Sequence, residues 1–193
     1  MNRWSVQRKL FLLSGFLMAI IVAVGGVGKY ATTTLSRDLE MVDNVHLPMI
    51  RNMTLADMMH EGLRATAYHA ILVSVQGVNA ENKQIVQDEF DVNSKSIIKY
   101  TDEVEKLAID DVIKQAVADA KPAVINYVAA AKVIVDLSLS SQKDQVFAKM
   151  EEFEKAFKVL EGKFDKLGDE IEKAADDDKG KGLAEAHLFN MLS

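Results

Sequence analysis

Residues 146–174 read VFAKMEEFEKAFKVLEGKFDKLGDEIEKA, and their apolar side chains recur at alternating steps of four and three residues. The recurring positions are Val146, Met150, Phe153, Phe157, Leu160, Phe164, Leu167, Ile171 and Ala174. The residues between them are mostly Glu, Lys and Asp. This spacing predicts a long helix with one buried apolar face and one solvated face. The phenylalanines on this stripe need no cofactor to explain them, because core packing accounts for apolar residues at helical spacing.

Three earlier segments repeat the same spacing, and each predicts another amphipathic helix. The first stripe consists of Leu35, Leu39, Val42, His46, Met49, Met53, Ala56, His60, Leu63, Ala67 and Ala70. The second consists of Val86, Phe90, Asn93, Ile97, Tyr100, Val104 and Leu107. The third consists of Ile113, Ala116, Ala120, Ala123, Tyr127, Ala130, Ile134 and Leu137. Asn93 is the polar member of the second stripe, where it is predicted to fix the register of packing.

Short polar breaks separate these segments at residues 76–79, 109–111 and 138–141. Connections this short force consecutive helices to be antiparallel neighbours. Asn79 and Asp110 suit the N-cap positions of the helices that follow the first two breaks. The sequence therefore predicts an all-α protein whose body is an antiparallel, up-down-up-down four-helix bundle.

Three local features qualify this prediction. Pro48 should kink or restart the first segment, and Pro122 predicts a kink near residues 118–121, because proline removes a helical hydrogen bond. The run DDDKGKG at 176–182 predicts a solvated acidic turn followed by a flexible break. It lacks the alternating ligands and the closing glutamate of a calcium loop.

Residues 10–28 read LFLLSGFLMAIIVAVGGVG and contain no charge. A run of about twenty apolar residues is long enough to span a bilayer as a helix. Basic residues at positions 3, 8 and 9 precede the run, whereas the flank after it carries mixed charges. The excess of basic residues before the run predicts that residues 1–9 are cytoplasmic, that 10–28 span the membrane and that 29–193 lie outside the cytoplasm.

A cleaved signal peptide is the alternative, since residues 23–25 (AVG) resemble a small-x-small cleavage site. The apolar run is longer than the hydrophobic region of most signal peptides, and a helical repeat follows it without a separating loop. Both observations favour a retained anchor.

Composition excludes several classes of function. The chain has no cysteine, which excludes disulfides, thiolate metal sites and cysteine nucleophiles. Its net charge of −6 and lack of a basic face argue against nucleic-acid binding. No catalytic motif or phosphate-binding loop is present. No two of His46, His60 and His69 are three or four residues apart, so we expect no metal site, no cofactor and no enzymatic activity.

Arg64 is the residue most suggestive of a ligand. It lies on the first amphipathic segment near Tyr68 and His69, and its guanidinium offers two parallel donors to a carboxylate. The alternative is a surface ion pair with Glu61, because exposed pairs of this kind are common and weak.

Together these features resemble the four-helix-bundle sensor domain of bacterial methyl-accepting chemotaxis receptors. The resemblance rests on the basic N-terminus, the first membrane helix, the V-x-L-P motif at residues 45–48, the stretch RNM at 51–53 and the three further amphipathic helices. It covers essentially the whole chain and is specific in layout rather than in motif. In the family, a second membrane helix, a HAMP linker and a methylated cytoplasmic hairpin follow the bundle. This sequence ends at Ser193, so we expect either a fragment of a longer receptor or a protein without its own cytoplasmic output.

The resemblance implies a ligand-sensing module in the bacterial inner membrane. It implies a dimer, with a small molecule or a periplasmic binding protein as partner. The apolar positions from Leu35 to Val42 have too few partners in their own chain, which predicts homodimerisation through the first helix, and Arg64 favours an anionic small molecule. Ligand contacts in the family come from the distal first helix and the start of the fourth, which here correspond to Arg64, Tyr68, Ser141 and Gln142. A membrane-anchored adaptor or structural protein that binds another protein is the competing interpretation.

Overall fold

The structure is a computed structural model that describes residues 6–192 and, among these, the side chains of residues 8–178. Its elements are α1 (Val6–Met41), the π-helix η1 (Val42–His46), α2 (Leu47–Gln76), α3 (Ala80–Leu107), α4 (Asp111–Leu139) and α5 (Lys143–Leu192). No strand occurs within residues 6–192. The chain divides into two compact units, one formed by residues 42–176 and the other by α1 with the end of α5.

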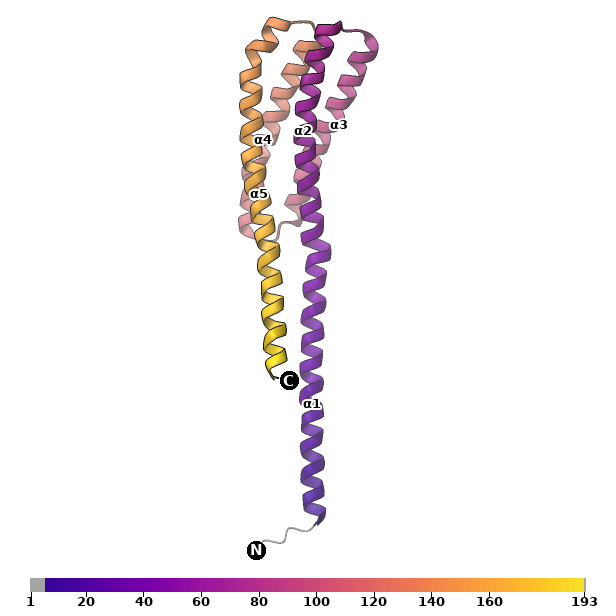
Figure 1. The fold of residues 1–193 in the computed structure, drawn as a ribbon, viewed down its shortest axis with the longest axis vertical. Helices are drawn as coiled ribbons and strands as arrows, with labels where there is room; N and C mark the ends of the chain where they lie inside the picture. The colour runs from indigo at the N-terminus through magenta and orange to yellow at the C-terminus, as the bar shows by residue number, and fades with distance from the viewer. Residues whose placement is uncertain (1–5, 193) are drawn as a thin grey trace. The chain divides into compact units, whose positions relative to one another are not determined.

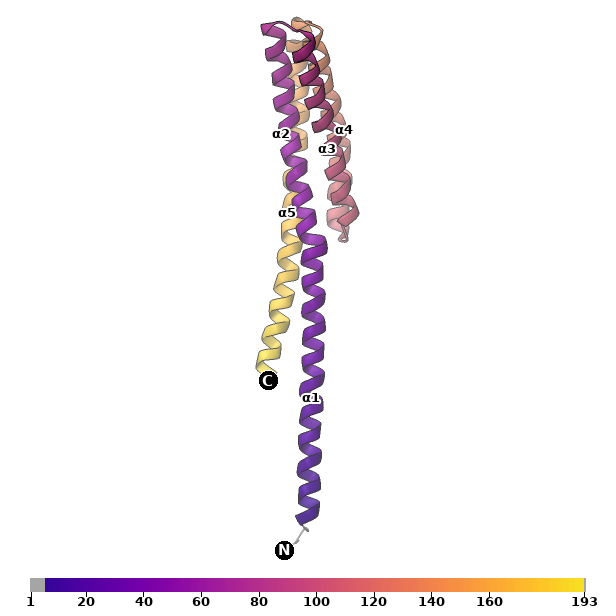
Figure 2. The same cartoon turned by 90° about the vertical axis from the view of Figure 1, so that its right-hand side faces the viewer.

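The larger unit is a four-helix bundle. α2, α3, α4 and the first part of α5 lie side by side in both views of the ribbon (Figures 1 and 2). The loops at 77–79, 108–110 and 140–142 are three residues each, so each helix runs antiparallel to the one before it. The predicted all-α, up-down-up-down bundle is therefore confirmed.

Side-chain caps begin two of the helices, as the sequence predicts. The Asn79 side chain accepts a hydrogen bond from the Asn82 amide at 2.9 Å, and the Asn82 side chain accepts one from the Asn79 amide at 2.8 Å. Asp110 accepts a bond from the Val112 amide at 2.6 Å. These bonds satisfy amide groups that have no partner within the helix. Gly77 ends α2 with a φ of +112°, a conformation that other residues adopt only with strain.

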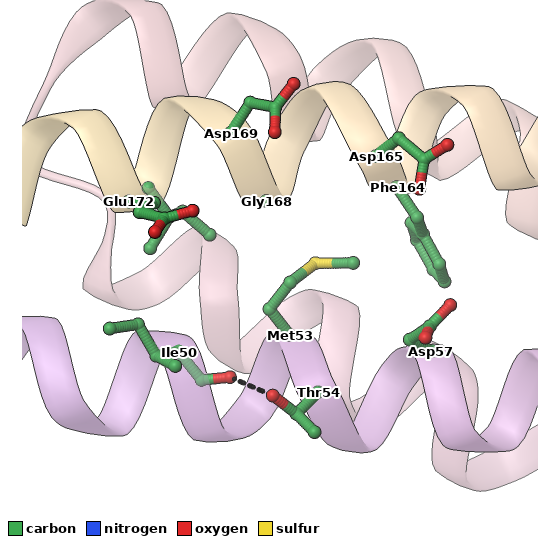
Figure 3. A pocket seen from close by; sticks show the side chains of 10 residues that line it. Ile50, Met53, Thr54, Asp57, Phe164, Asp165, Gly168, Asp169 and Glu172 are labelled. Carbon is green, nitrogen blue, oxygen red and sulfur yellow. Dashed lines mark hydrogen bonds between the residues drawn. The ribbon is translucent and has the colours of Figure 1, made fainter.

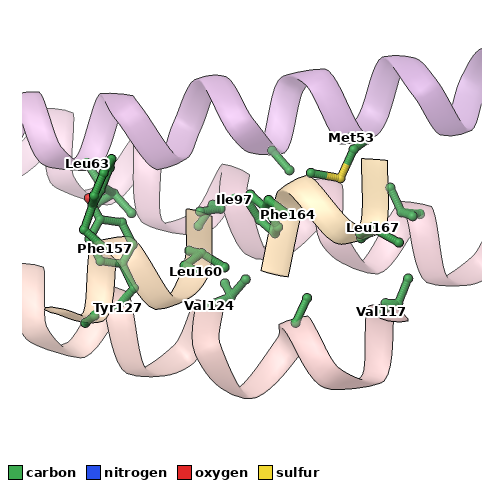
Figure 4. Packing of buried hydrophobic residues seen from close by; sticks show 14 of the residues in the cluster. Met53, Leu63, Ile97, Val117, Val124, Tyr127, Phe157, Leu160, Phe164 and Leu167 are labelled. Carbon is green, nitrogen blue, oxygen red and sulfur yellow. The ribbon is translucent and has the colours of Figure 1, made fainter. Parts of the chain in front are cut away.

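The predicted stripe on α5 forms the centre of the core (Figure 4). Seven of its residues are buried: Val146, Phe153, Phe157, Leu160, Phe164, Leu167 and Ile171. Met150 and Ala174 are partly buried and pack against the same cluster. From α2, the stripe from Met49 to Ala67 is buried in the same core and Ala70 in a second, smaller cluster, whereas Leu35 and Leu39 are each 60% exposed. The core therefore extends along the bundle but does not include the first part of the stripe.

Asn93 lies at a close contact between α2 and α3. Its amide donates to the Thr66 hydroxyl at 3.0 Å, and Thr66 donates to the Gly62 carbonyl at 2.9 Å. A side-chain carbon on Gly62 would lie 3.2 Å from Asn93, so the glycine makes room for the amide. Asn93 is thus on the seam as predicted, and its role in fixing the register stays a prediction.

The two prolines are accommodated differently. Pro48 stands in the first turn of α2, directly after the π-helix η1. Its ring would clash with the carbonyl four residues earlier in an α-helix, and the wider π turn relieves that clash. The helical run continues through Pro48 with this π turn before it, and the predicted kink or restart there stays a prediction. Pro122 lies on the exposed side of α4, which continues on both sides of it. The kink predicted near residues 118–121 stays a prediction.

The break predicted over residues 176–182 is wrong. α5 continues through these residues to Leu192 without interruption. A glycine inside a helix costs only about 1 kcal/mol relative to alanine, and a helix that is already formed can extend through it. The glycines at 180 and 182 therefore weaken the helix without ending it.

Two helices are long and apolar enough to span a membrane. One is the helical run 8–76, whose most apolar stretch is entirely unburied, and the other is α4. α4 meets the criterion as core helices do, because it turns Val117, Val124 and Ile134 into the bundle. The apolar side chains of α1, including Phe11 and Phe16, are exposed in the structure.

Neighbouring residues of α5 provide a direct test of this core. Leu160 is fully buried, whereas Val159 is 46% exposed. We expect Leu160→Ala to lower the free energy of unfolding by about 2–5 kcal/mol, because it removes buried methyl groups and leaves a cavity. Val159→Ala should change it by less than about 0.5 kcal/mol. Urea unfolding of the full chain in detergent, followed by helical circular dichroism, measures both. Equal unfolding midpoints for the two variants would show that the stripe is not the core.

Candidate functional site

Arg64 and Tyr68 stand one turn apart on α2, and both contact a carboxylate on α5. Arg64 Nη2 donates to Glu154 Oε2 at 2.9 Å, and the Tyr68 hydroxyl donates to Glu154 Oε1 at 2.7 Å. The Arg64 and Glu154 side chains are 34% and 27% exposed, so solvent still reaches the pair. One carboxylate is therefore held by a guanidinium and a phenol at once, which is a geometry suited to recognising carboxylates.

An aromatic ring supports this group from the core side. The Arg64 guanidinium carbon lies 4.1 Å from the centre of the Phe157 ring, within the range of a cation–π contact. Arg64 Nε is buried and makes no hydrogen bond within the described residues. The Nε–H of Arg64 is thus buried without a hydrogen bond to any described residue, while Nη2 holds Glu154.

The charges in this group depend on one another. The hydrogen bond to Glu154, together with partial burial and the negative charge nearby, raises the pKa of Tyr68, so the phenol remains a donor. Burial acts to lower the pKa of Arg64, but the charge and hydrogen bond of Glu154 outweigh it, and the pKa is raised. The site is therefore a cation and a neutral donor around an anion.

A histidine lies in the core one turn before Arg64. His60 is 1% exposed and stacks on Phe157 with 4.1 Å between ring centres. Its Nε2 donates to the Phe157 carbonyl at 3.2 Å, and the Tyr127 hydroxyl donates to the His60 carbonyl at 3.1 Å. Phe164 meets the same imidazole edge-on at 5.9 Å. His60 therefore ties α2 to α4 and α5 directly beneath the Arg64 group.

The imidazole is held neutral by its surroundings. Desolvation by burial lowers the pKa of His60 below 6.5, and it is only partly offset by the bond to the Phe157 carbonyl and by three carboxylates. Those carboxylates belong to Glu61, Asp57 and Glu161.

The structure brings together only part of the predicted site. Arg64 and Tyr68 are joined through Glu154, so the ion pair is made across helices and not with Glu61, as the alternative interpretation supposed. Ser141 and Gln142 lie in the loop between α4 and α5, where their amides bond to the carbonyls of Ser138 and Leu137. Gln142 is twelve positions before Glu154, or about 18 Å along the helix axis. His69 faces α3 instead, with Nδ1 2.8 Å from Glu89.

Sequence analysis missed Glu154, the residue that completes the group. It is one of many acidic residues on the solvated side of the α5 stripe, directly after the buried Phe153. Its position beside the stripe marks it as a flank of the helix interface, but the spacing alone does not say which residue of α2 lies opposite.

Comparison with known protein families matches residues 3–186 to the four helix bundle sensory module for signal transduction. The chain belongs to this family. No curated protein and no solved structure matches it significantly. The predicted identity as a sensory module of chemotaxis receptors is confirmed, and the family is a signalling module and not a catalytic domain.

The sensory module should lose stability in mild acid through His60. In the unfolded chain the imidazole titrates near 6.5, and in the folded bundle its pKa is lower, so the unfolded state binds more protons between the two values. The contribution of neutral His60 is fully present above pH 6.5 and is lost as the pH falls from there toward the folded pKa.

The measurement is the free energy of unfolding by urea at several pH values above and below 6.5, for the parent and for His60→Gln. Glutamine keeps an N–H donor but does not titrate, so its pH dependence in this window should be flatter than the parent's. Identical slopes in the two proteins would show that His60 does not carry the effect.

Proposed function

We propose that this chain is the ligand-sensing, extracytoplasmic module of a membrane chemoreceptor and that its ligand is an anionic small molecule. The observation that carries the proposal is the Arg64 and Tyr68 pair, which already holds a carboxylate between α2 and α5. Because the pair remains solvent-accessible, a carboxylate from solution can compete with Glu154 for the same donors.

The proposed location is the bacterial inner membrane. Residues 1–9 would be cytoplasmic, 10–28 would form the membrane helix, and 29–193 would lie outside. This assignment is supported by the basic residues before position 10 and by the uncharged run that follows them. Phe11 is 82% exposed and Phe16 65% exposed in the structure, a state that water disfavours and a bilayer favours.

We infer a homodimer formed through the first amphipathic stretch. Leu35 and Leu39 are each 60% exposed, and Val42 is 39% exposed. Further exposed residues share one side of α2. They are Leu47, Ile50, Thr54 and Met58, followed after a gap of ten residues by Tyr68, Leu72 and Val75. A two-fold dimer buries such a surface against its own copy. Tyr68 belongs both to this surface and to the Glu154 group, which would place the ligand group at the dimer interface.

The proposed signal is a shift of packed helices. A ligand changes the equilibrium between two arrangements only if it binds one of them better. Displacing Glu154 from Arg64 would remove a polar tie between α2 and α5, while the ties through His60 remain. A ligand that binds Arg64 and α5 better when the two helices are displaced would thus favour a small sliding of α2 against α5.

The second candidate is an anchored adaptor that binds another protein, such as a periplasmic binding protein. The specific observation in its favour is that Glu154 already satisfies Arg64 within the chain. A bundle with no small ligand would keep this contact permanently, and its exposed apolar residues would then serve a protein partner.

Variants of Arg64 and Glu154 discriminate between these functions. In a thermal-shift screen of the full chain against organic acids and amino acids, we expect at least one anion to raise the melting temperature. Arg64→Ala should abolish that shift, and Arg64→Lys should restore it poorly, because a point charge cannot present two parallel donors. Glu154→Gln should strengthen ligand binding, since it removes the competing charge.

A ligand that shifts the parent and Arg64→Ala equally would contradict the proposed site. If Glu154→Gln weakens binding instead of strengthening it, Glu154 is part of the ligand site and not a competitor. An absence of any shift in the parent across the whole screen would favour the adaptor. Helical circular dichroism of each variant controls for loss of folding.

Cross-linking tests the dimer independently of any ligand. The chain has no cysteine, so single cysteines report on one position each. Cysteines at the stripe positions Leu35, Leu39 and Val42 should form disulfides between subunits in membranes. Cysteines at Arg37 and Glu40, which point away from the stripe, should do so several-fold more slowly. Equal rates at all five positions would show that this stretch is not the interface.

A further inference from the structure

A second place on the bundle has the form of a ligand site. An open groove of about 730 Å³ lies between α2 and α5 (Figure 3). Met53 and Phe164 form part of its floor and are almost fully buried. Met53 is eleven residues before Arg64 on α2, which is about 16 Å along the helix axis. The groove is therefore separate from the Arg64 and Glu154 group.

One residue that lines the groove has no side chain. Gly168 of α5 lines the groove, and a carbon added to it would meet no atom within 4 Å. In Figure 3 it faces the gap opposite Met53, with no side chain entering from that position. A larger side chain at position 168 would therefore extend into the groove.

The lining carries an unbalanced negative charge. Asp57 from α2 and Asp165, Asp169 and Glu172 from α5 all border the groove, and none of its described lining residues is basic. Figure 3 shows Asp57 and Glu172 at opposite ends of the gap, on either side of Met53. Among the described side chains, no lysine or arginine lies within ion-pairing distance of these four carboxylates. Asp57 Oδ1 lies 3.8 Å from Nδ1 of the neutral His60.

We propose that this groove binds an amphipathic organic cation, namely a protonated amine with a compact apolar body. The apolar body would cover Met53 and Phe164, and the ammonium group would be attracted by the carboxylates at the rim. Ligand pockets combine an apolar lining with a few polar groups that fix orientation, and the groove has both. An anion is disfavoured by the same charges. The apolar floor and the negatively charged rim together favour an organic cation over a neutral or an acidic ligand.

A ligand in the groove would act on the contact that holds α2 to α5. Phe164 lines the groove on one side and meets the buried His60 ring on the other. Ile50 and Thr54 line it too and also belong to the exposed side of α2. A bound ligand would therefore contact both the packed face of α5 and the surface proposed for the dimer.

The test uses the full chain in nanodiscs with methionine methyl groups labelled with carbon-13. The probe is 2-phenylethylamine, which is protonated at neutral pH. We expect the Met53 methyl signal, assigned by its loss in Met53→Leu, to shift saturably with the probe. Gly168→Leu should weaken binding by about tenfold or more, a loss of about 1.4 kcal/mol, because its side chain fills the groove. Gly162→Leu is the matched control, since Gly162 is exposed on α5 with equally open space but does not line the groove.

Charge is tested by the probe and by the protein. Neutral 2-phenylethanol should not shift Met53 at the same concentrations, and Asp169→Asn combined with Glu172→Gln should weaken amine binding and its dependence on salt. The proposal is overturned if Met53 does not respond to the amine, if Gly168→Leu binds as well as Gly162→Leu, or if the alcohol binds as well as the amine. None of these outcomes depends on Arg64, so the proposed anion site stands or fails separately.

Discussion

The rest of the structure depends on the contact between α2 and α5 around His60. These helices are neighbours in the bundle but almost a hundred residues apart in the chain, and His60 joins them through a stack on Phe157 and a bond to its carbonyl. A buried imidazole is tolerated only when its polar atoms are satisfied and it stays neutral. Both conditions are met because the α5 carbonyl accepts from the ring and burial lowers the pKa of His60. The contact sets the register of α2 against α5, and this register determines which side chains meet on either side of His60.

The polar group at Arg64 is one of those consequences. One turn beyond His60, the same register places the Arg64 guanidinium over the Phe157 ring and within hydrogen-bonding distance of Glu154. An apolar seam therefore supports a charged pair at its edge, where solvent still competes for the charges. Such a pair adds little to stability by itself, since partly exposed ion pairs are weak. In the proposed function, that weakness would let an external carboxylate compete with Glu154 for Arg64.

Two glycines of the bundle have opposite effects on packing: one allows close contact between helices, and the other leaves space open. At Gly62 the Asn93 side chain of α3 fills the space that a larger residue would take. The helices approach closely there, and the Asn93 amide donates a hydrogen bond to Thr66. At Gly168 nothing occupies the space, and a groove with an apolar floor and an acidic rim remains. Close packing is the default in protein interiors, and an unfilled position is therefore informative. The bundle is thus closely packed at Gly62 and open at Gly168.

The sequence by itself determined the class of fold, the number and order of the helices, their caps at Asn79 and Asp110, and nearly all of the core on α5. It did so because helical periodicity and short loops are local properties that a single chain displays directly. It also identified Arg64 and Tyr68, but not Glu154, and it wrongly expected α5 to break over residues 176–182. Only the tertiary structure decided which residue of α5 stands opposite Arg64, that His60 is a core residue bonded across the bundle, and that Gly168 leaves a groove. These are relations between distant segments. They depend on the relative register of two antiparallel helices, and the periodic stripe of each helix is compatible with several registers until the side chains of both are packed together.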